Sequence, residues 1–271
     1  MARTVGLTQL IVLAALQGLT EVFPVGAEGH FALITQILDG SGPTNAFRLA
    51  LHIGVLLGVA AYFWRDVGDM AVGVIRAAKG KSNPDARLAL QLAVAAVPTL
   101  GLGFAFEQYL AGDWQTLQVM GWTIVGGALA LWLFDRMCMT VKRVEHGTYL
   151  DAIIVGLGQV IALVPGAGAV GVTLARLLGY ERRDAARLYF LLSIPVSAAV
   201  IASDAYTLFT VENGSLSNID ILCCLVGFFA ALIGLAILMA WLRRSSFTPF
   251  VIYRLLLGAA VLALAYGWVA L

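Results

Sequence analysis

Residues 17–30 read Gln17-Gly-Leu-Thr-Glu-Val-Phe-Pro-Val-Gly-Ala-Glu-Gly-His30 and lie between two apolar, almost uncharged segments. The stretch carries three ionisable side chains, Glu21, Glu28 and His30, and its proline and glycines interrupt any continuous helix. Ionisable groups at membrane depth are costly, and broken backbone there is tolerated only where it is buried in protein or lines a wet cavity. The stretch therefore predicts a functional site before it indicates which kind.

The composition is that of a helical membrane protein. The 271 residues are 61% hydrophobic and 12% charged, and soluble domains carry roughly twice that charged fraction. The net charge of +1 gives no basic surface for nucleic acid. The N-terminal residues show no cleavable signal pattern, and the three cysteines show no pairing pattern. We therefore expect no removable signal peptide, no disulfide and no thiolate metal site.

The apolar segments predict an all-α polytopic fold with six transmembrane spans and two re-entrant helical hairpins. The hairpins, at about 5–38 and 150–178, are each interrupted by proline and glycine, and their halves are short for the roughly 20 residues that span a bilayer. A polar loop is expected at about 65–87. The spans are expected at about 44–64, 88–106, 118–136, 187–209, 220–242 and 250–270.

The basic residues divide unequally between the two sides of this topology. Fifteen lie on one side and only Arg3 and Arg48 on the other. Because cytoplasmic loops are enriched in Lys and Arg, we expect a multi-pass membrane protein with both termini outside the cytoplasm. If either hairpin were a transmembrane crossing, the basic residues would be distributed over both sides of the membrane. Their unequal distribution therefore supports the assignment of both segments as re-entrant hairpins.

The two halves of the single membrane domain resemble an inverted repeat, about 1–136 and about 150–271. Gln17 lies seven residues before Pro24, and Gln159 lies six before Pro165, each followed by a glycine-rich run. Inverted repeats with broken helices at matching positions indicate a central binding site. Helices that restart after each break present free N–H groups, which suit a phosphate.

The same residues carry a family likeness that covers nearly the whole chain. Residues 18–30 and 163–173 resemble the two motifs of the bacterial undecaprenyl-diphosphate phosphatases, also called bacitracin-resistance proteins. Segments 47–54, 190–195 and 247–254 are similar to three more stretches of that family. The resemblance implies removal of the terminal phosphate from undecaprenyl diphosphate, which recycles the lipid carrier for peptidoglycan synthesis.

The chain departs from these motifs where the resemblance places the chemistry. Gln17 replaces the family's first glutamate, Gly26-Ala27 its serine pair, and Glu28 the following threonine. The Ser-Arg-Ser core of the family's second motif is replaced here by Gly168-Ala169-Val170. Ala27 has no hydroxyl to act as a nucleophile, and Ala169 has no guanidinium to clamp a phosphate. Hydrolysis is therefore expected to be lost or rebuilt, and enzyme activity is an open question.

The candidate catalytic residues are Glu21, Glu28 and His30. Glu21 and Glu28 would hold Mg²⁺ or Ca²⁺ in place of the missing positive charge, and His30 would act as a base on water. The candidate substrate-binding residues flank the two breaks: Gln17, Gly26, Ala27, His52, Gly166, Gly168, Ala169 and Thr173.

Each of these residues also has a structural interpretation. Glu21 and His30 would then be a polar pair that fixes the hairpin, and Glu28 would face the outer water. His52 would be a packing histidine, and the glycines of the second break would serve close helix packing. Arg48 either lies at the outer interface or supplies the positive charge that Ala169 lacks.

Three functions stay open. The first is a family member that binds polyprenyl phosphate or diphosphate, with hydrolysis lost or rebuilt. The second is a transporter or flippase of a phosphorylated polyprenyl lipid, with Glu21 and His30 coupling transport to protons. The third is a partner-binding pseudoenzyme. The expected partners are the polyprenyl lipid and membrane lipids, with no nucleic acid, and a homodimer is also compatible with the sequence.

Overall fold

The computed structural model describes residues 6–27, 29–30, 33–34, 44–81, 83–109, 116–138 and 140–269. Apart from one isolated bridge between Lys142 and Tyr180, the regular structure of these residues is helical. Six helices are long and apolar enough to cross a membrane. The chain is therefore an all-helical polytopic membrane protein, as its composition predicts.

The helices follow the predicted segments closely. The spanning helices are α3 (Asn45–Tyr62), α5 (Pro84–Tyr109), α7 (Leu117–Met137), α10 (Arg182–Tyr206), α11 (Asn218–Trp241) and α12 (Thr248–Ala265). A π-helical turn, η2 (Thr207–Val211), continues α10, and a 3₁₀ turn, η1 (Val144–His146), precedes α8. The hairpin helices are α1 (Leu7–Val22), α8 (Tyr149–Ile161) and α9 (Val170–Leu177).

Several of these helices begin where a hydroxyl side chain can cap them. Thr44, Thr116 and Thr148 accept a hydrogen bond from a backbone N–H in the first turn of α3, α7 and α8, and Ser217 does the same for α11. Such caps satisfy donors that the helix itself leaves free. With 16 residues, α1 is about 24 Å long, which is short for a hydrocarbon core of roughly 30 Å.

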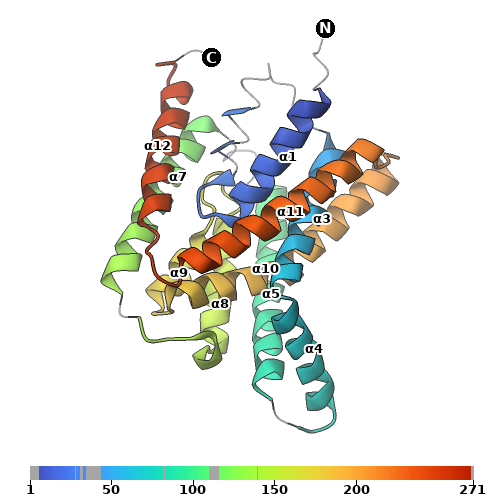
Figure 1. Ribbon diagram of the computed structural model, residues 1–271, viewed down its shortest axis with the longest axis vertical. Coiled ribbons are helices and arrows are strands. Elements are labelled where there is room, and N and C mark those ends of the chain that lie inside the picture. Colours follow the sequence, from blue (N-terminus) through green and yellow to red (C-terminus); the bar gives the residue numbers. More distant parts are fainter. Residues whose placement is uncertain are drawn as a thin grey trace.

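The predicted polar loop at about 65–87 is wrong, because it contains helix α4 (Trp64–Ala78). Val67, Met70 and Gly73 recur at three-residue spacing and form the less exposed face of this helix, which packs on α5. Arg65, Asp69 and Arg76 are exposed on its open face, and Asp66 pairs with Arg187 of α10. These charged side chains gave the segment the composition of a loop. In Figure 1, α4 projects at the end of the molecule opposite the start of α1 and the end of α12.

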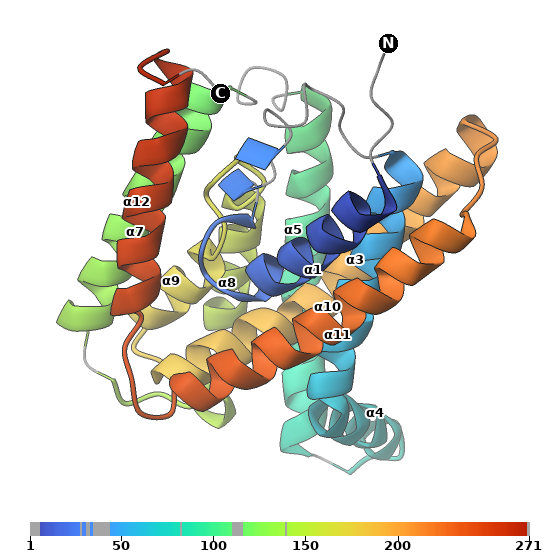
Figure 2. The same cartoon turned by 45° about the horizontal axis from the view of Figure 1, so that its top comes forward.

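The helices of the two halves pack in an exchanged pattern (Figure 2). Helix α1 packs on α11 and α8 on α5, while α3 packs on α11 and α10 on α5. When α1, α3, α5 and α7 are matched with α8, α10, α11 and α12, each contact maps onto another, and α7–α12 maps onto itself. The α1–α11 approach requires glycine, since a Cβ on Gly18 would lie 2.8 Å from the carbonyl oxygen of Gly227. This is the packing expected of an inverted repeat; the exact repeat bounds stay a prediction.

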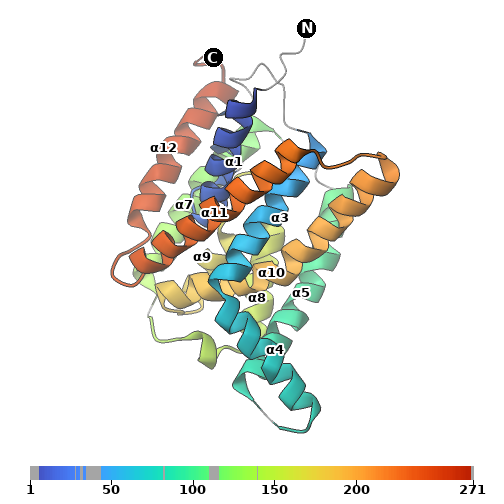
Figure 3. The ribbon, with the colours of Figure 1, turned by 45° about the vertical axis from the view of Figure 1, so that its right-hand side comes forward.

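Two arginines assigned to the basic side lie inside the protein instead. Arg176 is 1% exposed and Arg254 is fully buried. Arg176 pairs with Asp135 of α7, with 3.0 Å between Nε and Oδ1. Because Arg176 and Arg254 make their contacts inside the protein, their positions carry no information about which side of the membrane is cytoplasmic. The other basic segments, including α4 and the α11–α12 connection, lie away from the start of α1 and the end of α12 (Figure 3).

Candidate functional site

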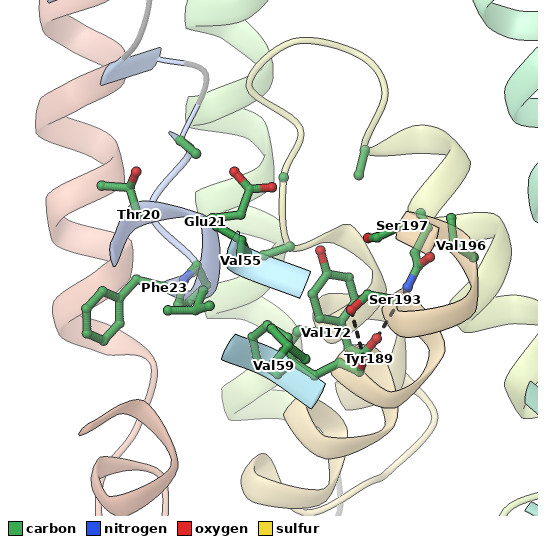
Figure 4. Close-up of a pocket in the computed structure, with 18 of the residues that line it drawn as sticks. Thr20, Glu21, Phe23, Val55, Val59, Val172, Tyr189, Ser193, Val196 and Ser197 are labelled. Atoms are coloured by element: carbon green, nitrogen blue, oxygen red, sulfur yellow. Dashed lines mark hydrogen bonds between the residues drawn. The ribbon is translucent and has the colours of Figure 1, made fainter. Parts of the chain in front are cut away.

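The structure brings the two hairpin breaks together at one cavity of about 290 Å³. Glu21, Gly26 and Ala27 of the first break line it opposite Gly168 and Ala169 of the second. Figure 4 shows that α3 adds an apolar wall through Val55 and Val59, and that α10 adds Tyr189, Ser193 and Ser197. The meeting of the breaks, which the topology predicts, therefore creates a site with a polar rim and an apolar wall.

Glu21 is the acidic group of this cavity. It lies in the last turn of α1, is exposed, and its side chain is drawn among the lining residues in Figure 4. Gln17, one helical turn earlier, donates a hydrogen bond from Nε2 to Glu21 Oε2 at 3.0 Å. Gln17 is not among the lining residues. In this structure it bonds Glu21, and its predicted contact with a ligand stays a prediction.

His30 lies behind the first break. It is 8% exposed, with Nδ1 2.9 Å from the carbonyl oxygen of Gly26 and Nε2 2.6 Å from the hydroxyl of Tyr253. A carbonyl only accepts, so Nδ1 carries the proton and Nε2 of the neutral ring accepts from Tyr253. His30 is not among the residues that line the cavity. This placement differs from the predicted base on water and agrees with the alternative that His30 fixes the hairpin.

The backbone conformation of the second break depends on two residues with positive φ and on a contact with α7. Gly166 has φ +83° and Ala169 has φ +68°, in the left-handed region. A Cβ on Gly166 would lie 2.5 Å from the carbonyl oxygen of Met120, so only glycine fits there. Thr123 donates a hydrogen bond to the carbonyl of Pro165. Gly166 is thus needed for the shape of the loop and is not a lining residue.

Arg254 of α12 fixes the same loop from behind. Its Nη1 donates to the carbonyl of Gly168 at 2.8 Å, and its Nη2 donates to the carbonyl of Gly166 at 3.0 Å. Thr173, predicted to bind substrate, is buried and donates to the carbonyl of Ala169 at 3.1 Å. Its hydroxyl is thus bonded within the second hairpin and is not presented to the cavity.

His52 lines the cavity from α3, and its predicted contact with substrate stays a prediction. Its Nδ1 lies 3.9 Å from Asp204 Oδ2 of α10, and both side chains are near half exposed. Arg48, one turn earlier on α3, is exposed and is not among the lining residues. Of the two alternatives for Arg48, its exposed position outside the cavity lining is the one compatible with the outer interface.

The lining carries little fixed positive charge. Among its described residues Glu21 is a carboxylate and His52 an imidazole, and none is Lys or Arg. Glu28 lies outside the described residues, so a metal held between Glu21 and Glu28 stays a prediction. The described part of the chain has no group of three His, Cys, Asp or Glu side chains placed to hold a metal ion.

Sequence reasoning missed the contributions of α10 and α12. Ser193 and Ser197, four residues apart in an apolar span, share one helix face, and this spacing was the available signal. Gln159 donates to the backbone carbonyl of Tyr189 at 3.3 Å and so joins the second hairpin to α10. Arg254 was detectable as a charge within a predicted span.

Comparison with known proteins agrees with this architecture. The model of the family "Bacitracin resistance protein BacA" matches residues 10–260. "Undecaprenyl-diphosphatase 1" of Rhodospirillum rubrum is 43% identical over 270 residues, covering 96% of this chain and 95% of that protein. The proteins named "Undecaprenyl-diphosphatase" of Ruegeria pomeroyi and Roseobacter denitrificans are 37% and 38% identical, each covering 96% of this chain and 99% of the relative. The chain belongs to the bacitracin resistance protein BacA family.

Proposed function

We propose that this chain binds the headgroup of a polyprenyl phosphate or diphosphate in the cavity between the two breaks, without the family's serine-and-arginine route of hydrolysis. Its relatives are named for undecaprenyl diphosphate, which gives the class of lipid and a place in lipid-carrier recycling for cell-wall synthesis. The apolar wall of α3 suits the first isoprene units, and the polar rim suits the headgroup.

One observation carries the proposal: the cavity brings together Ala27 and Ala169, where the family motifs have serine and arginine. Phosphoryl transfer needs positive charge on the phosphoryl oxygens and a nucleophile or an activated water. Loss of one such group typically costs on the order of 10²–10³ in rate, and here both are replaced by methyl groups. A lipid phosphate can still bind through its tail and the backbone N–H groups of the breaks.

A metal-assisted route is the way in which hydrolysis would be rebuilt. Mg²⁺ is usually held by one or two carboxylates together with substrate phosphates, and Glu21 offers such a carboxylate at the cavity. Glu28 would be the second ligand. The bound ion would supply the charge that Ala169 lacks.

The test is phosphate release from undecaprenyl diphosphate by the purified protein, with and without Mg²⁺ or Ca²⁺, beside Glu21→Gln. We expect lipid binding without phosphate release in the absence of metal. The double variant A27S/A169R should gain release, because it returns the hydroxyl and the guanidinium to the cavity. Metal-independent release by the unchanged protein would overturn the proposal. Release that needs both metal and Glu21 would assign the rebuilt route.

A transporter of the same lipid is the second candidate, favoured by the exchanged packing of the two halves. Such symmetry allows one half to rock against the other around a central site. Movement of a fluorescent polyprenyl phosphate across vesicles, driven by a pH gradient and without phosphate release, would select this function. Equal movement in protein-free vesicles would eliminate it.

The proposed location is the bacterial inner membrane with both termini outside. The support is the basic end of the molecule, where Arg65, Arg76, Lys79 and Lys81 accompany α4, since such residues favour the cytoplasmic side. Reporter fusions at the C-terminus and in the 79–83 connection should give opposite sidedness. Identical sidedness would refute this topology.

A further inference from the structure

A second cavity, of about 670 Å³, lies near the membrane end that carries α4. We name it the arginine cleft. It is built from the connection after α7, the first turns of α10 and the residues that follow α11. Its lining residues are Thr140, Arg143, Glu145, Glu181, Arg182, Arg183, Asp184, Arg187, Leu242 and Arg243. It is separate from the cavity between the breaks and shares no lining residue with it.

The carboxylates of the arginine cleft are already engaged. Glu181 accepts from Arg143 Nε at 3.3 Å. Glu145 and Asp184 lie 3.2 Å and 4.0 Å from Arg187 Nη1, and Arg187 also pairs with Asp66 of α4. Each acidic group of the lining therefore has an arginine of the same cleft as an ionic partner, with Arg187 shared between Glu145, Asp184 and Asp66.

Arg183 and Arg243 are the two arginines of the lining that have no carboxylate partner among the described residues. Both are exposed, and neither makes a hydrogen bond or an ion pair with the described part of the chain. The other arginine of the lining, Arg182, is bonded to Asp135 Oδ1 at 2.8 Å. Two guanidinium groups without a counter-charge therefore line one open cavity, where an anion would find two forked donors.

The level of the cleft relative to the membrane indicates that such an anion would be a lipid headgroup. Arg182 is the first residue of α10 and Trp241 the last of α11, and both helices are candidate spans. The cleft thus lies where spanning helices leave the apolar layer. The Trp241 indole donates to the carbonyl of Ser246 at 3.1 Å, and tryptophan is enriched at this level. Leu242 gives the cleft a buried apolar residue.

We propose that the arginine cleft binds the phosphate headgroup of an anionic phospholipid, with Arg183 and Arg243 as its ligands. The phosphodiester would accept hydrogen bonds from both guanidinium groups while its acyl chains stay beside α10 and α11. Basic pockets between transmembrane helices are suited to such headgroups. The site is independent of the lipid cavity between the breaks.

The test compares R183Q/R243Q with a matched control, R76Q/R244Q, which removes two exposed arginines from the same end of the molecule but outside the cleft. Each protein is reconstituted in phosphatidylcholine nanodiscs, and binding of a fluorescent phosphatidylglycerol is titrated. We expect the cleft variant to bind at least about thirtyfold more weakly, because each of its two guanidinium groups would lose a charge-assisted hydrogen bond to the phosphodiester. The control should change little.

Three results would overturn the proposal. An equal loss in both variants would mean general attraction to the basic end of the protein. Phosphatidylcholine carries the same phosphodiester but no net charge, so equal binding of phosphatidylglycerol and phosphatidylcholine would mean that the cleft does not select an anionic lipid. Displacement of the bound lipid by millimolar inorganic phosphate would assign the cleft to a free anion instead of a membrane lipid. Folding of each variant is checked by its thermal unfolding in detergent.

Discussion

Tyr253 and Arg254 are consecutive on α12, and each holds one of the two hairpin breaks. The Tyr253 hydroxyl lies 2.6 Å from His30, whose other ring nitrogen bonds Gly26 in the first break. Arg254 donates to the carbonyls of Gly166 and Gly168 in the second break. Adjacent helix positions point about 100° apart, so one helix reaches both breaks from a single turn. The width of the cavity between the breaks therefore depends on where α12 lies.

Arg254→Met should open the second break. The variant keeps an apolar stem but leaves two buried carbonyls without their charged donor, which we expect to cost about 3 kcal/mol. Arg254→Lys should recover only part of this, because one ammonium group cannot copy the planar fork. Thermal unfolding in detergent and polyprenyl-phosphate binding measure the two effects. Arg244→Met, at an exposed site, is the control, and an equal loss there would refute the role of Arg254.

Tyr253→Phe should loosen the first break more gently. The substitution removes one hydroxyl and keeps the ring, so an effect of about 1 kcal/mol is expected. A double-mutant cycle with His30→Gln should then show coupling, since the two side chains are in direct contact. Tyr149→Phe, on an exposed tyrosine, is the matched control. Strictly additive effects of the His30 and Tyr253 changes would show that the contact contributes nothing.

The sequence predicted those features of the fold that depend on local composition. Proline and glycine within apolar sequence predicted both hairpins, and hydropathy predicted the six spans. The same approach missed α4, because its polar residues occupy one open face of a helix instead of a loop. It also assigned His30 and Thr173 to the ligand, since sequence shows which residues flank a break but not the side to which each points. The partner of His30 is 223 positions away, and no local pattern indicates such a pair.

Gln17→Glu should create a cation site next to the lipid cavity. The Gln17 amide lies 3.0 Å from the Glu21 carboxylate, so the substitution places two carboxylates within bridging distance. Like charges this close repel unless a cation joins them. The variant should be less stable without metal and gain at least about tenfold in affinity for Ca²⁺ or Mg²⁺. Metal-dependent thermal shifts measure this.

Gln9→Glu is the control for that experiment, since it adds the same charge to an exposed position on α1. A metal-dependent shift of the same size in both variants would mean that added charge alone is responsible. A shift confined to Gln17→Glu would identify Glu21 as the carboxylate to which a divalent ion is brought.

Arg176→Met should be the most destabilising of these changes. Arg176 is buried, and its Nε donates to Asp135 Oδ1 at 3.0 Å while its Nη2 donates to the backbone carbonyl of Asp135 at 3.1 Å. It also donates hydrogen bonds to Thr140 and to the carbonyl of Tyr180. It thereby ties the end of the second hairpin to α7. The substitution removes one of the two arginines that pair with the buried Asp135, the other being Arg182, and it leaves the Tyr180 carbonyl without this donor. Loss of a buried ion-pair partner typically costs about 3–5 kcal/mol. Arg143→Met, which removes an exposed pair with Glu181, should cost no more than about 1 kcal/mol. Asp135→Asn alone leaves the buried Arg176 without its carboxylate, whereas D135N/R176M leaves only the partly exposed Arg182 without one. The double variant should therefore unfold at a higher temperature than Asp135→Asn, and the reverse order would contradict this account of the pair.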